Sequence, residues 1–255
     1  MSAPRRAVAR AAIVLAIATA LLTGCGATAG DDFPAGEARA VTTDEAQLLA
    51  ATRFHNFDAG VRTVAFALEE GGGSSGFTGW VDYANGVGYG RLATASDTRL
   101  LLWNSDVVGS HPTDAATAPL PIPDADRLAD AWTGGALTPS ESRLHTMLVM
   151  LGSLGADRPD NPLLLQQSGA LWLGERRLDG REVTVFAGPP SDEALPAGAT
   201  ADPDAASVRY WVDATGLLVR LDVRLGGGAD WTSVEFGDAT GVELGDPFTA
   251  AEAGS

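Results

Sequence analysis

The sequence predicts an α+β fold in which a mainly antiparallel β-sheet carries helices on one face. Two groups of short segments alternate apolar and polar residues, turn residues join neighbours within each group, and helical patterns come between the groups. Strands, then helices, then strands is the pattern of a sheet with its helices packed on one side. The 214 residues from Thr42 onward suffice for one core. No repeat or second linker divides them, so residues 42–255 are expected to form a single domain.

The first helix is expected to begin after Thr42. Thr42-Thr43-Asp44-Glu45 forms a capping box, in which the Thr42 side chain accepts a backbone N–H bond and Glu45 reaches back to the N-cap. The apolar positions that follow share one face of a helix, and they are Ala46, Leu49, Ala50 and Phe54.

A first group of strands follows this helix. Apolar residues alternate from Val64 to Leu68, and the glycine-rich residues 71–76 predict a turn into a partner strand. Asn85-Gly86 is the strongest short-range hairpin signal. The expected strands, which together form an antiparallel meander, are 64–68, 77–84, 87–95 and a hairpin over 99–109.

The middle of the chain is expected to be helical. Asp124 is suited to cap a short helix over 124–132, and Asn161-Pro162 to start another over 161–165. Between them, Thr138-Pro139-Ser140-Glu141 combines a capping box with a proline at the first helical position. The helix that follows, from Ser140 to Leu151, is apolar almost all round, so it needs cover on two sides.

A second group of strands is expected toward the C-terminus. Asp179-Gly180 and Gly216 mark two of its turns. From Leu217 to Leu225 an apolar residue occupies every odd position, which predicts one buried and one solvent-facing side. The expected strands are 170–178, 181–187, 207–213, 217–225 and 230–236.

The N-terminus has the three parts of a bacterial signal peptide. The first ten residues contain three arginines, and residues 11–22 form an apolar run of signal-peptide length rather than a bilayer span. Leu22-Thr23-Gly24-Cys25 then resembles a lipobox and contains the only cysteine of the sequence. The resemblance implies cleavage before Cys25 and attachment there of a diacylglycerol and of fatty acids such as palmitate. An ordinary secretory signal with an incidental cysteine, or an uncleaved anchor, is the alternative.

The expected organisation is a signal peptide over 1–24, an acylated cysteine with a flexible tether over 25–41, and the domain over 42–255. A tether of this length spans about 22 Å as a coil. The protein is therefore expected at the extracytoplasmic face of the cell membrane, attached by its acyl chains. Acylation of Cys25 leaves no cysteine for a disulfide, so the core alone holds the fold.

The charge of the chain argues against two kinds of partner. The net charge is −16, and removal of residues 1–24 takes away three arginines and no acid, which brings it to −19. A surface this acidic repels phosphate backbones and anionic headgroups, so neither nucleic-acid binding nor electrostatic adhesion to membranes is expected. All seventeen basic residues are arginine. This bias of high-GC coding sequences indicates an actinobacterial source.

No motif predicts catalysis or a cofactor. Gly72-Gly73-Ser74-Ser75-Gly76 matches the G-x-S-x-G pattern, but it lies between two strands rather than on the strand-to-helix elbow of a serine hydrolase. His145 follows Glu141 by one helical turn, a pair usual in surface electrostatics and without the spacing of a zinc motif. The aspartates at 124–130 begin like a calcium loop but lack its glycine. We therefore expect neither an enzyme nor a metal or other cofactor.

The apolar content leaves two interpretations open. Six tryptophans are spread over the expected strands and helices, and Met147 and Met150 add adaptable side chains to the apolar helix. A well-filled core explains this content, and so does an apolar cavity between sheet and helices.

Two segments and the lipobox cysteine carry a family resemblance. The segments are Tyr210-Trp211-Val212-Asp213-Ala214-Thr215-Gly216-Leu217-Leu218-Val219-Arg220 and Asn161-Pro162-Leu163-Leu164-Leu165. Over roughly residues 42–248 the chain is similar to the LolA/LolB and mycobacterial LppX/LprG group of lipoproteins. The resemblance implies a strongly curved antiparallel half-barrel, closed by helices on its concave face, that holds a lipid or a lipoprotein acyl chain. The residues expected to line the ligand site are Leu144, Met147, Leu148, Leu151, Phe66 and Val81.

The expected function is non-enzymatic binding or transport of a lipid or acyl chain in the cell envelope, by a monomeric, membrane-anchored lipoprotein. The alternative is an interaction or scaffold lipoprotein with a filled core, which acts on a cell-wall or membrane partner. A hydrolase ranks third, because it needs a nucleophile, a base and an orienting acid to converge.

Overall fold

The computed structural model describes residues 38–122, 132–190, 196, 202–245 and 247–248. Its strands are β1 (Arg39–Ala40), β2 (Val61–Glu70), β3 (Gly73–Asp82), β4 (Val87–Thr94), β5 (Thr98–Trp103), β6 (Val107–Pro112), β7 (Thr133–Ala136), β8 (Leu171–Leu178), β9 (Arg181–Ala187), β10 (Val208–Asp213), β11 (Leu218–Val223) and β12 (Thr232–Asp238). Its helices are α1 (Thr43–Asp58), α3 (Arg143–Ser153), α4 (Pro162–Gln167) and a 3-10 turn at Pro203–Ala205.

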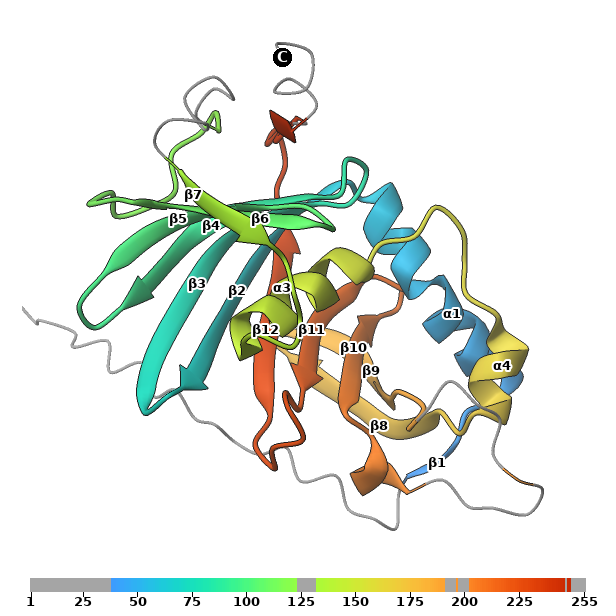
Figure 1. Ribbon diagram of the computed structural model, residues 1–255. Coiled ribbons are helices and arrows are strands. Elements are labelled where there is room, and N and C mark those ends of the chain that lie inside the picture. Colours follow the sequence, from blue (N-terminus) through green and yellow to red (C-terminus); the bar gives the residue numbers. More distant parts are fainter. Residues whose placement is uncertain (1–37, 123–131, 191–195, 197–201, 246, 249–255) are drawn as a thin grey trace, which may run out of the picture. The chain divides into compact units, whose positions relative to one another are not determined.

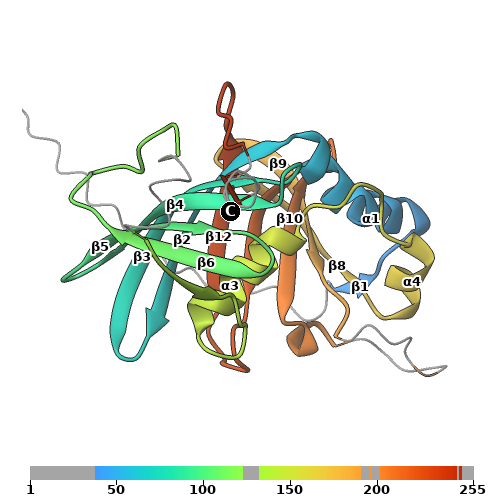
Figure 2. The same cartoon turned by 45° about the horizontal axis from the view of Figure 1, so that its top comes forward.

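The strands form one antiparallel sheet in the order β1-β8-β9-β10-β11-β12-β2-β3-β4-β5-β6-β7. Strands β2 to β7 make one meander and β8 to β12 a second, and β12 pairs with β2 to join them. The sheet is curved, and α3 lies on its concave face, while α1 and α4 pack on each other near β8 (Figure 1). Figure 2 shows the same arrangement from a second direction. The predicted α+β class, with a curved antiparallel sheet and helices on its concave face, is confirmed.

Two hairpins form where their turn residues predicted them. Asp179 and Gly180 both have positive φ, 49° and 82°, and connect β8 to β9 as a two-residue turn. The Asn85-Gly86 hairpin has a four-residue loop instead, because Asp82 accepts hydrogen bonds from the backbone of Ala84 and Asn85 at 3.1 Å each. Turn chemistry is local, which is why sequence alone located these reversals.

Other boundaries differ from the predictions. The turn expected over 71–76 shrinks to Gly71-Gly72, whose φ values of 61° and 81° reverse the chain in two residues. Ser74 therefore lies in β3, opposite Glu69, and not in a turn. The short helix predicted over 124–132 falls outside the described residues except for its last position, and β7 was not predicted.

Helix α3 begins later than its capping pattern indicated. The N-cap is Ser142, whose side chain accepts from the His145 backbone N–H at 3.0 Å. Thr138 does not cap the helix, because the chain is hydrogen-bonded to the sheet up to Leu137. The Leu137 N–H donates to the backbone carbonyl oxygen of Asp106 at 2.7 Å. A turn then redirects the chain into the helix.

The strict alternation expected from Leu217 to Leu225 is interrupted in β11. A β-bulge leaves Val219 unopposed by β10, so the residues before it change sides. Leu218 consequently joins Leu221 in the concave core, while Val219 packs with the convex face. The second face is not solvated either, since Asp222 is buried.

The sheet begins inside the segment expected to be a tether. Arg39 and Ala40 pair with Trp172 and Leu171 of β8, and Val41 is buried. The described domain thus starts a few residues before Thr42.

Helix α1 begins with the predicted capping box. Thr42 donates its N–H to Glu45 at 2.8 Å and accepts from the Glu45 N–H at 3.3 Å. Arg39 adds two hydrogen bonds to the Glu45 carboxylate, at 2.7 and 2.6 Å. The Arg39 bonds, together with those from Thr42, lower the pKa of Glu45 from 4.5 to about 2.

This carboxylate is expected to make stability depend on acid pH. Because the pKa of Glu45 is lowered in the folded state, its stabilisation is fully present above about pH 4.5 and is lost as the pH falls toward 2. The pair is partly solvated, so the effect is about 1 kcal/mol. Urea unfolding of the parent and of Glu45→Gln is expected to differ near neutral pH and to converge at about pH 2. A difference that stays constant over this range would contradict the assignment.

The concave face holds the larger core. Phe66 stacks on Phe77 with ring centroids 5.0 Å apart, and Phe77 meets the edge of Trp103 at 5.6 Å. Gly88 faces the Trp103 ring so closely that a Cβ at this position would overlap it. Glycine inside these strands therefore makes room for aromatic rings to lie on the sheet.

The convex face carries two further apolar clusters. One gathers around Trp211 on β8 to β11, and the other around Tyr89 and Leu102 on β4 and β5. The sequence patterns predicted one buried face, whereas the structure buries apolar residues on both. No described helix is long and apolar enough to cross a membrane.

Candidate functional site

The six residues predicted to line a ligand site lie together on the concave face. Phe66 and Val81 belong to the sheet side of one apolar cluster. From α3, Met147, Leu148 and Leu151 belong to the same cluster, and each is 0% exposed. Leu144 packs against this cluster from the first turn of α3 and is only partly buried. The structure thus brings the predicted residues together, with the centre of the group closely packed.

A pocket opens at each end of α3. The pocket at the N-terminal end has a volume of about 410 Å³. Apolar side chains of the sheet and Leu144 line it together with charged and polar groups. Its lining residues are Leu92, Arg99, Leu101, Val108, Gly109, Ser110, Thr133, Gly135, Ala136, Glu141, Leu144 and His145. This volume lies within the usual range for small-molecule sites.

Three of the charged or polar side chains that line this pocket, His145, Glu141 and Arg99, have partners. The His145 Nδ1 atom lies 3.7 Å from a Glu141 carboxylate oxygen and 3.2 Å from the Thr138 carbonyl oxygen. Arg99 pairs with Asp97 at 3.1 Å. A lining that mixes apolar side chains with a few paired polar groups is typical of small-molecule sites.

The pocket at the C-terminal end of α3 has a volume of about 390 Å³. Helix α4 contributes Leu164 and Leu165, and β10 contributes Tyr210, whose pKa burial raises. Its lining residues are Arg53, Ser153, Leu154, Asp160, Asn161, Leu164, Leu165, Ser168, Pro189 and Tyr210. Helix α3 therefore has a pocket at each end, and its fully buried side chains belong to the concave core.

Polar contacts hold α3 at its ends. At the start, the Arg143 backbone N–H donates to Glu70 at 2.8 Å and its guanidinium to the Glu69 carbonyl oxygen at 3.0 Å. At the end, Arg53 donates to the Ser153 carbonyl oxygen at 2.8 Å. Between these ends, the core-facing side of the helix meets the sheet through apolar side chains.

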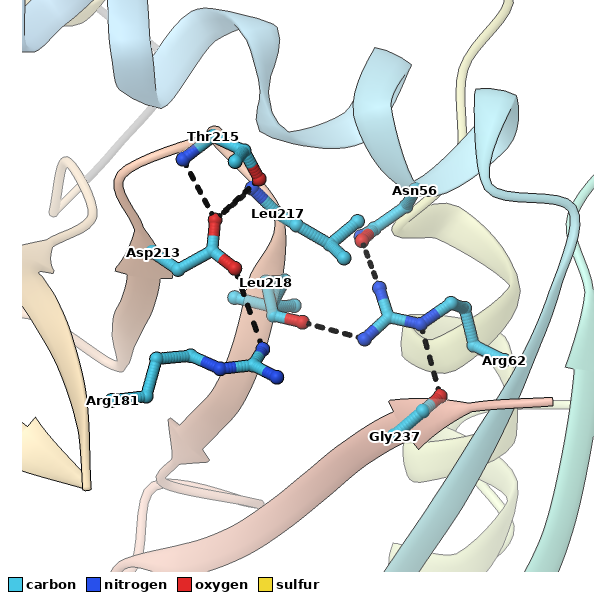
Figure 3. A network of polar contacts seen from close by, with 8 residues as sticks. All are labelled: Asn56, Arg62, Arg181, Asp213, Thr215, Leu217, Leu218 and Gly237. Atoms are coloured by element: carbon cyan, nitrogen blue, oxygen red, sulfur yellow. Dashed lines mark hydrogen bonds and ion pairs between the residues drawn. The ribbon is translucent and has the colours of Figure 1, made fainter. Parts of the chain in front are cut away.

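Arg62 is a buried cation that ties helices to the sheet (Figure 3). It is 1% exposed and donates to Asn56 at 3.2 Å, to the Leu218 carbonyl oxygen at 3.1 Å and to the Gly237 carbonyl oxygen at 3.1 Å. Asn56 in turn donates to the Leu154 carbonyl oxygen at 2.9 Å. Desolvation lowers the pKa of Arg62. Sequence analysis missed this residue, although an arginine two positions before Val64 stands on the apolar face of that strand.

The adjacent β10–β11 turn is built around Asp213 (Figure 3). One of its carboxylate oxygens accepts from the Thr215 N–H at 2.9 Å, the Thr215 hydroxyl at 2.6 Å and the Leu217 N–H at 3.1 Å. Arg181 reaches the other oxygen at 3.3 Å. These contacts fix the turn within residues 210–220, and both oxygens of the Asp213 carboxylate take part in them.

A third pocket, of about 450 Å³, lies on the convex face between Trp80, Ala118 and Glu235. Partial burial raises the pKa of Glu235, while Arg220 at 3.7 Å opposes the rise. The aromatic and arginine groups beside it are bound into a network, in which Asp222 accepts from Trp211 at 2.7 Å and from Arg220 at 2.7 Å. We assign this network to the stability of the sheet.

The residues weighed for catalysis belong to different elements. Ser74 is in the β2–β3 hairpin, whereas His145 is in α3 beside Thr138 and Glu141. Within the described ranges no group of three or more His, Cys, Asp or Glu side chains is placed to hold a metal ion. The aspartates at 124–130 lie outside these ranges.

Comparison with known proteins does not identify a family for this chain. No protein-family model matches the chain, and no curated protein matches it. Among solved structures, the chain is similar to a domain from Vibrio parahaemolyticus described as an outer membrane lipoprotein-sorting protein domain. The two are 12% identical, the match covers 72% of this chain and 88% of that chain, and the TM-score is 0.22. A sequence identity and a TM-score this low do not support assigning a function to this chain. The structure itself defines a curved antiparallel sheet with a helix-covered apolar concavity.

Proposed function

We propose that the protein binds a lipid or lipoprotein acyl chain between the concave face of its sheet and α3. The observation that carries the proposal is the position of α3 between two pockets of about 410 and 390 Å³. The middle of the helix carries Met147, Leu148 and Leu151, which are apolar and fully buried in the concave core. A small displacement of this helix would join the two pockets into one apolar channel.

The energetics favour a hydrocarbon as the ligand. The polar contacts of α3 are at its two ends, so a chain inserted beneath its middle replaces apolar contacts with apolar contacts. Such an exchange leaves no hydrogen bond unsatisfied provided that the contacts at the ends stay in place, among them the buried bond from Asn56 to the Leu154 carbonyl oxygen. The unbranched side chain of Met147 is suited to adapt to a ligand of varying shape.

We further propose that acyl chains on Cys25 hold the protein at the extracytoplasmic face of the cell membrane. The acidic composition supplies no attraction to anionic headgroups, so attachment has to be hydrophobic. Fractionation tests this part of the proposal. A Cys25→Ala variant with its signal peptide removed is expected in the soluble fraction, and its persistence on membranes after high-salt washing would contradict the anchor.

An interaction or scaffold lipoprotein is the second candidate function. It is favoured by the complete burial of Met147, Leu148 and Leu151, which is also what a permanently filled core shows. The two functions differ in what happens when the space beneath α3 is taken up by a larger side chain.

Met147→Trp is expected to lower the affinity for a fluorescent long-chain fatty acid at least about tenfold, which corresponds to 1.4 kcal/mol. In a carrier the indole takes the place of the ligand, so the melting temperature changes little. Met150→Trp is the matched control, because Met150 is on the same helix and only partly buried. Fluorescence titration and thermal unfolding of both variants provide the measurement.

The scaffold predicts the opposite pair of results. Overpacking a filled core costs about 1–3 kcal/mol. A large loss of stability in Met147→Trp without any change in fatty-acid binding would therefore favour the scaffold over the carrier.

A further inference from the structure

Two neighbouring leucines of α4 are exposed on a well-fixed turn. Leu163 is 57% exposed and Leu164 is 43% exposed. The N-cap Asn161 holds the turn by accepting from both of their backbone N–H groups, at 3.0 and 3.3 Å. Among the described residues the other exposed large apolar side chains, Val107 and Leu120, occur singly in β6 and in the loop after it. The two leucines thus form a small exposed apolar pair on an ordered turn.

The strand through which the chain enters the domain lies at the same edge. β1 pairs with β8, the strand that follows α4, and Gln166 of α4 donates to the Val41 carbonyl oxygen at 3.4 Å. Both views place β1, α4 and β8 at one end of the sheet (Figures 1 and 2). Thirteen residues lead from Cys25 to Ala38. A chain of that length reaches at most about 45 Å. A membrane anchor on Cys25 would therefore hold this edge within about 45 Å of the bilayer.

The edge also carries side chains suited to a membrane boundary. The Arg39 guanidinium stacks over the Trp172 ring, 4.2 Å from its centroid. Tryptophan and arginine each combine an apolar body with a polar end, so both favour the zone between headgroups and hydrocarbon. The leucines supply the part that enters the hydrocarbon.

We propose that Leu163 and Leu164 dock into the lipid bilayer, so that the pocket at the C-terminal end of α3 opens toward the membrane. Leu164 is itself part of the wall of that pocket. The inference rests on the proposed function, because it names the bilayer as the source or destination of the bound acyl chain. Two leucines bind a bilayer weakly on their own, and the acyl anchor on Cys25 makes the contact effective by keeping it close.

The contact is tested by placing an environment-sensitive fluorophore at each position. Leu163→Cys and Leu164→Cys, in the full acylated protein, are labelled with a nitrobenzoxadiazole thiol probe, and Val107→Cys and Leu120→Cys are the matched controls. The proteins are reconstituted in vesicles of phosphatidylcholine with a minority of phosphatidylglycerol, with and without acyl-brominated phosphatidylcholine. Labelling of the parent shows whether Cys25 is blocked. The probes at 163 and 164 are expected to emit at shorter wavelength and to be quenched by the brominated lipid, whereas the controls stay as in water.

Emission at 163 and 164 that matches the controls would overturn the proposal. A blue shift without quenching would also overturn it, because protein rather than lipid would then cover the leucines. The result is separable from the proposed function, which is measured by fatty-acid binding in solution. Leu163→Ser, which leaves the lining of the pocket unchanged, is expected to take up a fluorescent fatty acid from vesicles more slowly while binding it in solution with parental affinity. Failure of binding in the parent would remove the proposed function and leave the bilayer contact to be decided by quenching.

Discussion

Replacing Arg62 with methionine is expected to lower the free energy of unfolding by about 3 kcal/mol. The Arg62 guanidinium donates to Asn56 and to the carbonyl oxygens of Leu218 and Gly237 in a buried place. Methionine leaves these three acceptors without their donor, and each such loss costs about 1–3 kcal/mol. Part of the cost is offset because the variant no longer desolvates a charge, the effect that lowers the pKa of Arg62. Urea unfolding measures the difference.

Two further variants make this prediction specific. Arg62→Lys keeps the charge but cannot span three acceptors with one planar group, so an intermediate loss is expected. Arg177→Met is the control, because Arg177 is on the exposed end of β8 and its ion pair is with Glu182, which is exposed as well. Its stability should remain within about 0.5 kcal/mol of the parent. Equal stability of Arg62→Met and Arg177→Met would show that the buried network contributes nothing.

Leu148→Ala is expected to cost about 2 to 5 kcal/mol in the lipid-free protein. Leu148 is 0% exposed at the centre of the concave core, and alanine leaves a cavity beneath α3. Saturation with a long-chain fatty acid is expected to reduce this loss, because hydrocarbon then occupies the space that the leucine vacates. Leu163→Ala, on the exposed side of α4, is the matched control with an expected change below about 0.5 kcal/mol. A loss that is unaffected by fatty acid would contradict ligand binding beneath α3.

The elements that sequence analysis located correctly depend on local interactions. The capping box of Thr42 and Glu45 forms as predicted. Asp179-Gly180 adopts the left-handed backbone that a two-residue hairpin requires. Strand β9 has the predicted bounds for the same reason, since its start is set by this turn. In each case the residues that decide the structure are within a few positions of one another.

The features that were missed depend on contacts between separate elements, some of them far apart in the sequence. The bulge at Val219 arises from pairing with β10 across a turn, and the late start of α3 from the tie between Leu137 and Asp106. Arg62 finds its acceptors on α1, β11 and β12, which no pattern within β2 indicates. Of the candidate site, the apolar members were predictable from periodicity, whereas the two pockets at the ends of α3 depend on how the sheet curves beneath it.

Native mass spectrometry of the purified full chain tests the central claim most directly. Binding of an acyl chain beneath α3 predicts a noncovalent lipid mass that is present in the native spectrum, disappears on denaturation and is absent from Met147→Trp. Any covalent acyl mass on Cys25 remains in both states and is thereby distinguished. Identical native and denatured masses, in protein extracted from its own membranes, would contradict lipid binding and favour the filled-core scaffold.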